Sequence, residues 1–124
     1  LIYIKSLISQ LKNDPITSKI PVILFAREPE FSCNEMVQSQ ADCLSLYWST
    51  KNIDLNFLSG KVALQGNLNP KILLQEDSII KIETNRILDK FKGYQGYIFN
   101  LGHGITPNIS PDKIKLLTDH IRSR

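Results

Sequence analysis

The chain has 124 residues, of which 42% are hydrophobic and 22% charged, as in an ordinary globular domain or a part of one. Its 15 basic and 12 acidic residues give a net charge of +3, and the basic residues are scattered rather than grouped. This pattern disfavours nucleic-acid binding but permits an anionic ligand. No apolar run approaches the roughly 20 residues of a membrane span, so we expect no membrane partner.

Hydrophobic periodicity predicts five helices alternating with four strands. Ile4, Leu7, Ile8 and Leu11 share one helical face, and Asn13-Asp14-Pro15 ends that first helix. In chain order we predict a helix at 1–12, a strand at 21–26, a helix at 32–40, a strand at 42–47, a helix at 53–58, a strand at 62–66, a helix at 77–92, a strand at 97–100 and a last helix starting at 110–111.

Local sequence signals support several of these boundaries. Ser32 and Glu35 have the spacing of a capping box, Gly60 and Gly93 follow two helices, and Ser110 precedes the last one as its N-cap. The strands are short and apolar throughout, which predicts burial on both faces. Alternation of this kind predicts a parallel α/β sheet, either a small open sheet or half of an eight-stranded barrel.

In both architectures ligands bind beyond the carboxyl ends of the strands. The segments expected at that edge are rich in polar residues: 27–30, 47–50, 65–70 and 100–104. His103 stands there between two glycines, and we expect Gly102 and Gly104 to permit positive φ and close approach of a ligand. A histidine in such a loop is a candidate functional residue, and the simpler interpretation is a bond to its own turn.

Two motifs identify a resemblance. VALQGNLNP at 62–70 and YIFNLGHGITPNISPDKI at 97–114 resemble the carboxyl-terminal part of the uroporphyrinogen decarboxylase family, and PVILFAREPEF and LSLYW resemble its earlier segments. The resemblance covers the whole chain. It implies a single partial domain, 1–124, that is the carboxyl-terminal half, about four βα units, of a (β/α)8 TIM barrel.

The resemblance also implies a function. The family removes the carboxyl groups of four acetate side chains of uroporphyrinogen III to give coproporphyrinogen III, in haem biosynthesis, with no metal or organic cofactor. By likeness His103 is the catalytic residue. The residues implied to bind the tetrapyrrole substrate are Gln65, Gly66, Asn67, Asn100, Gly102 and Gly104. A cytoplasmic protein that forms a homodimer when full length is further implied.

The chain departs from the family pattern at Ser45, Tyr47 and Asn69, where glycine, aspartate and aspartate are usual, and at Pro29, where glycine is frequent. It also begins with Leu1 rather than methionine and lacks the family's amino-terminal arginines, aspartate and tyrosine. We therefore expect a fragment without the amino-terminal catalytic residues.

Three alternatives stay open: an inactive truncated relic, a related zinc-dependent barrel methyltransferase, and a small open-sheet binding module. The methyltransferase needs a cysteine near the end of the last strand, and none lies between Asp54 and Arg124.

Other conspicuous side chains have structural interpretations. Tyr47 and Trp48 are expected to pack at the rim rather than stack on a ligand, and Arg27 to be solvated or to pair with Glu28 or Glu30. The second histidine, His120, is expected on the surface or at the end of the last helix. Two cysteines, Cys33 and Cys43, match no metal-binding spacing, and we expect reduced, buried thiols.

Overall fold

The computed structural model describes residues 1–27 and 31–124. Its elements are α1 (Ile2–Asn13), β1 (Ile23–Phe25), α2 (Cys33–Met36), β2 (Cys43–Ser45), α3 (Leu55–Leu58), β3 (Ala63–Gln65), α4 (Asp77–Lys90), β4 (Tyr97–Ile98) and α5 (Pro111–Arg122), with 3-10 turns η1 (Val37–Ser39) and η2 (Pro70–Leu74). The predicted alternation of helices and strands is confirmed. Within the described residues, no helix has both the length and the apolarity needed to cross a bilayer.

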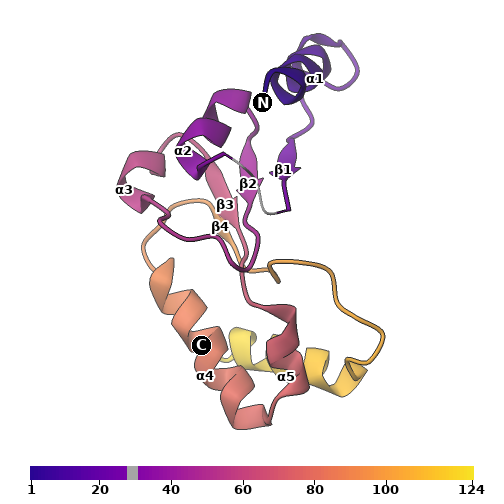
Figure 1. Ribbon diagram of the computed structural model, residues 1–124, viewed down its shortest axis with the longest axis vertical. Helices are drawn as coiled ribbons and strands as arrows, with labels where there is room; N and C mark the ends of the chain where they lie inside the picture. The colour runs from indigo at the N-terminus through magenta and orange to yellow at the C-terminus, as the bar shows by residue number, and fades with distance from the viewer. Residues whose placement is uncertain (28–30) are drawn as a thin grey trace.

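All four strands are parallel and lie side by side in chain order, β1-β2-β3-β4. Figure 1 shows α1 beyond one end of this sheet and α4 with α5 beyond the other. A doubly wound sheet reverses its strand order part-way, whereas a barrel adds each strand beside the previous one. The order therefore decides between the two predicted architectures in favour of part of a (β/α)8 barrel.

Strand register divides the sheet into two faces, because successive side chains point to opposite sides. Leu44 and Leu64 lie on one face and are fully buried in the core beneath the helices. The opposite face carries Ile23, Phe25 and Ile98, whose exposed fractions are 50%, 44% and 46%. The prediction that the strands are buried on both faces is therefore confirmed for β2 and wrong for the outer strands β1 and β4. In a barrel this second face is the interior, and in this chain it lies open at the outer strands.

Helix ends follow local sequence signals. Ser32 and Glu35 form the predicted capping box, but the predicted helix at 32–40 divides into α2 and η1 and ends at Gln40 in the left-handed region. The η2 turn was not predicted. It begins where the Asn69 side chain accepts a hydrogen bond from the amide of Lys71.

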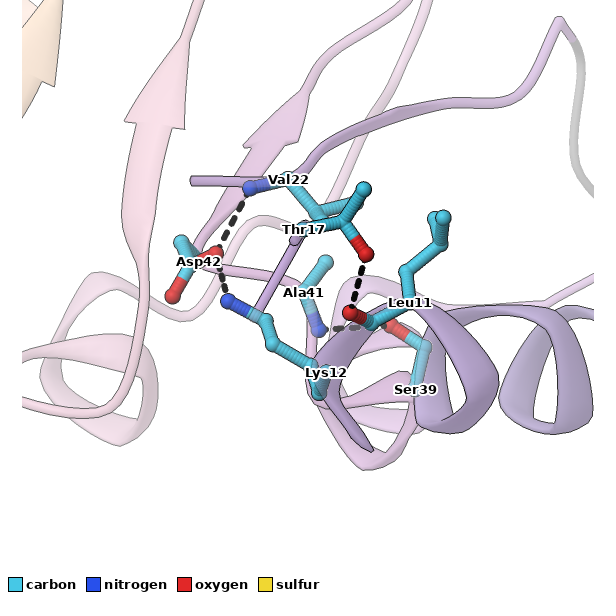
Figure 2. Close-up of polar contacts among 7 residues, drawn as sticks. All are labelled: Leu11, Lys12, Thr17, Val22, Ser39, Ala41 and Asp42. Atoms are coloured by element: carbon cyan, nitrogen blue, oxygen red, sulfur yellow. Dashed lines mark hydrogen bonds and ion pairs between the residues drawn. The ribbon is translucent and has the colours of Figure 1, made fainter. Parts of the chain in front are cut away.

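Asp42 joins the first helix to the sheet at the amino ends of the strands (Figure 2). Its carboxylate accepts a hydrogen bond from the Val22 amide at 2.6 Å and forms an ion pair with Lys12 of α1. The hydrogen bond from Lys12, followed by that from the Val22 amide and then by the charge of Lys12, lowers the pKa of Asp42 below its ordinary value of 3.8. The carboxylate thus contributes to stability only when it is ionised.

We predict a pH dependence of stability from this contact. Because the folded-state pKa is lowered, the stabilisation is present above about pH 3.8 and is lost as the pH falls through the folded-state value. Urea unfolding of the wild type and of Asp42→Asn between pH 2.5 and 6 measures it. The difference in unfolding free energy between the two proteins should shrink toward low pH, and a constant difference would contradict this role of Asp42.

Candidate active site

The carboxyl ends of β2, β3 and β4 are joined by backbone hydrogen bonds that extend beyond the strands. Leu68 donates to the carbonyl of Asn100 at 3.2 Å, and Gly102 donates back to the carbonyl of Leu68 at 2.7 Å. The Trp48 amide then donates to the carbonyl of Gly102 at 3.1 Å. These bonds bring the three loops, 46–50, 66–69 and 99–104, to one edge of the sheet, as parallel strands predict.

His103 is exposed at this edge and lies over two aromatic rings. Its imidazole stands edge-on to Phe25 of β1, with 6.3 Å between ring centroids, and to Tyr47, with 6.0 Å. One flank of the imidazole therefore rests on aromatic carbon while the rest is open to a ligand. Phe25 was not identified from the sequence, because nothing in an apolar strand marks the residue that meets a loop far along the chain.

Close packing, rather than backbone conformation, explains why residue 102 is a glycine. A Cβ atom added there would lie 2.6 Å from the Cβ of Trp48 and even nearer to the backbone of that residue. Neither Gly102 nor Gly104 has positive φ, so that expectation is wrong, and a Cβ at Gly104 would meet nothing within 4 Å. Only the first glycine is sterically required, and it sets the loop of His103 directly against the loop after β2.

The amide side chains of the β3 end face β2. The Gln65 side chain donates to the hydroxyl of Ser45 at 3.0 Å, on the open face of the sheet. The Asn67 side chain is 4% exposed and donates through Nδ2 to the Tyr47 carbonyl at 3.1 Å. Its Oδ1 has no hydrogen-bond partner among the described residues. The Asn67 side chain is therefore bonded to the backbone of Tyr47, whose ring contacts His103. The Oδ1 atom of Asn67 is an acceptor without a donor among the described residues.

Two further predicted residues take different positions. Asn100 is exposed, and its side chain accepts a hydrogen bond from the Leu101 amide at 2.8 Å, closing a local turn. Gly66 is buried and has a φ of +128°, and a Cβ there would lie 3.0 Å from the Leu46 carbonyl oxygen. The six predicted binding residues thus flank one edge, but only Gln65 and Asn67 have side chains directed to β2.

The structural interpretations of the remaining side chains are mostly confirmed. Tyr47 is buried and packs against Trp48, whereas Trp48 is partly exposed. Cys33 and Cys43 are buried free cysteines, and burial raises the pKa of both thiols, which keeps them protonated and unreactive. His120 lies in the last turn of α5 and bonds to the side chain of Asn85 at 2.8 Å.

The predicted ion pair of Arg27 and the sequence departure at Pro29 have no structural test. Arg27 is exposed, and its proposed partners Glu28 and Glu30, like Pro29, lie outside the described residues.

Within residues 1–27 and 31–124, no three His, Cys, Asp or Glu side chains gather as a metal site would require.

A cleft of about 610 Å³ adjoins this edge on the side of α4. Lys51, Arg86 and Lys90 line it together with Asn67 and Asn69, and Arg86 pairs with Glu83. Burial and the neighbouring Arg86 lower the pKa of Lys90. His103 does not line this cleft, which contributes positive charge beside the candidate site rather than a chemical group within it.

Comparison with known proteins decides the family. The model of the family described as Uroporphyrinogen decarboxylase (URO-D) matches residues 1–124. The chain belongs to the uroporphyrinogen decarboxylase family. The resemblance inferred from the two motifs is therefore confirmed over the whole chain, and the four βα units belong to the α/β fold of that family.

Curated members of the uroporphyrinogen decarboxylase family agree. The chain is 37% identical over 121 residues to the uroporphyrinogen decarboxylase of Paraburkholderia xenovorans, 38% over 120 residues to that of Alcanivorax borkumensis and 37% over 127 residues to that of Chloroherpeton thalassium. These matches cover 96%, 96% and 97% of the chain but 33%, 34% and 35% of the relatives. The chain thus spans about a third of the length of the curated relatives that it matches.

Proposed function

We propose that this chain is one partial domain, residues 1–124, of a uroporphyrinogen decarboxylase and supplies its loops at the carboxyl ends of the barrel strands. The substrate is uroporphyrinogen III, and the product, after loss of four acetate carboxyl groups, is coproporphyrinogen III. The observation that carries the proposal is the placement of His103, exposed on a platform of Phe25 and Tyr47 at the end of a parallel sheet.

The chemistry explains why an imidazole is useful there. Breaking the bond between the acetate methylene and its carboxyl group releases carbon dioxide and leaves an electron pair on the methylene carbon. Protonation of the pyrrole ring supplies an electron sink for that pair. A second proton then adds at the methylene carbon to make the methyl group, and the ring loses the first proton to become a neutral pyrrole again. His103 either donates a proton or, as imidazolium, binds a substrate carboxylate. Both roles need an open imidazole facing the ligand.

Other parts of the edge fit a large anionic ring. Phe25, which is 44% exposed, presents aromatic carbon to the flat macrocycle, while Lys51 and Lys90 in the adjoining cleft attract its carboxylates from a distance. The residues that we propose to bind the substrate lie at the same edge: Gln65, Gly66, Asn67, Asn100, Gly102 and Gly104. In this proposal the reaction needs no metal or organic cofactor, the complete protein is a cytoplasmic homodimer, and neither nucleic acid nor membrane is a partner.

A chimeric enzyme tests the proposal. The 124-residue chain replaces the matching third of the Paraburkholderia xenovorans relative, and uroporphyrinogen III is incubated with the purified protein. We expect products with seven, six, five and finally four carboxyl groups, separated by chromatography after oxidation to porphyrins. The unaltered relative is the control.

Two outcomes would contradict the proposal. A folded chimera that leaves all eight carboxyl groups in place would favour the inactive relic. Transfer of a methyl group to a thiol, dependent on added zinc, would favour the methyltransferase.

A further inference from the structure

Tyr97 is a half-buried polar side chain whose hydroxyl has no part in the proposed reaction. It lies in β4 on the helix-covered face, and its ring stacks on Phe91 at 4.5 Å with an angle of 12° between the planes. Burial raises the pKa of its hydroxyl, so the hydroxyl keeps its proton and acts as a donor. That proton is donated to the carbonyl oxygen of Gly66, the first residue of the loop after β3.

Gly66 is held on its other sides as well. Its amide donates to the carbonyl of Ile98 at 3.0 Å, and a Cβ added to it would lie 3.0 Å from the carbonyl oxygen of Leu46. The Gly66 carbonyl belongs to the peptide that leads into Asn67. The Tyr97 hydroxyl therefore contacts the peptide that directly precedes the buried side chain of Asn67.

Contacts continue from Asn67 to the imidazole. The Asn67 amide nitrogen donates to the Tyr47 carbonyl, and the ring of Tyr47 stands edge-on to His103. The Gly102 carbonyl accepts a hydrogen bond from the amide of Trp48, which joins the loop of His103 to the loop that contains Tyr47. An unbroken series of contacts thus runs from the helix-covered face of the sheet to its carboxyl edge.

We propose that Tyr97 is a positioning residue for His103, acting through Gly66, Asn67 and Tyr47 without touching the substrate. The inference deepens the proposed function and rests on it for its catalytic meaning, but the arrangement itself is tested without any turnover. Residues that contact the neighbours of a reactive side chain, rather than the side chain itself, also help to fix its geometry.

The fold supplies a matched control for the hydroxyl. Tyr94 also donates a hydrogen bond to a backbone carbonyl, that of Val62 at 2.6 Å, and burial likewise raises its pKa. Val62 precedes β3, at the opposite end of the strand from Gly66. Tyr94→Phe and Tyr97→Phe therefore remove equivalent bonds at the two ends of one strand.

The experiment records the imidazole proton resonances of the chain by NMR at a fixed pH. The two histidines give separate signals, and His120, bonded to Asn85 in α5, is the internal reference. Because Tyr47 and Phe25 stand edge-on to His103, its resonances report on their rings. We expect Tyr97→Phe to shift the His103 signals and leave those of His120, while Tyr94→Phe leaves both.

Two results would overturn the proposal. One is unchanged His103 signals in a folded Tyr97→Phe protein, and the other is an equal shift in Tyr94→Phe. If Tyr97→Phe does not fold, Asn67→Ala removes the next contact and spares the stack on Phe91. That variant must shift the same signals, and unchanged signals would refute the proposal. An inactive chimera, by contrast, would refute the proposed function alone.

Discussion

Replacement of His103 by alanine should lower the turnover of uroporphyrinogen by roughly 10²–10⁴-fold in the chimeric enzyme, the usual contribution of a positioned acid or base. The imidazole is exposed at the carboxyl edge and rests on Phe25 and Tyr47. Because these contacts are made by the rings and not by hydrogen bonds among the described residues, its removal should cost little stability. Initial rates measured by chromatography of the oxidised products check the effect.

The second histidine provides the matched control. His120→Ala removes an imidazole that bonds only to Asn85 within the described residues and lies at the end of α5. We expect this variant to keep its turnover, with at most a small loss of stability. Full activity of His103→Ala, in a protein that unfolds at the same urea concentration as the wild type, would remove His103 from the site.

Gly102→Ala should be the most damaging of the small substitutions. The new methyl group would overlap the backbone and Cβ of Trp48, and backbone cannot move aside as a flexible side chain does. Overpacking of this kind costs about 1–3 kcal/mol and occasionally more, and we expect about 3 kcal/mol because two backbone segments must separate. Urea unfolding followed by circular dichroism measures the change.

The neighbouring glycine distinguishes packing from loop flexibility. A methyl group at Gly104 meets nothing within 4 Å, and φ there is not positive, so Gly104→Ala should change stability by no more than about 0.5 kcal/mol. Equal effects of the two substitutions would show that the glycines serve backbone freedom rather than the contact with Trp48. The chimera should lose activity with Gly102→Ala because the loop of His103 is displaced.

The extent of the sequence prediction follows from the range of the interactions involved. Helical periodicity, the capping box of Ser32 and the cap at Ser110 are local, and they placed the helices and strands in the right order. The split of the predicted helix at 32–40 and the η2 turn were missed because hydrogen bonds of a single turn decide between α and 3-10 geometry. His103 and the loops near it were likewise found from motifs within one segment.

The remaining features of the fold and of the candidate site depend on contacts between residues that are far apart in the chain. Strand order, which indicates part of a barrel, depends on pairing between strands, and the exposure of Ile23, Phe25 and Ile98 depends on which face the helices cover. Phe25 and Tyr47 reach His103 only because three strands end at one edge. A sequence records which side chains are apolar, polar or small. Their neighbours across a sheet are settled only when the chain packs, since those contacts require the whole core to form.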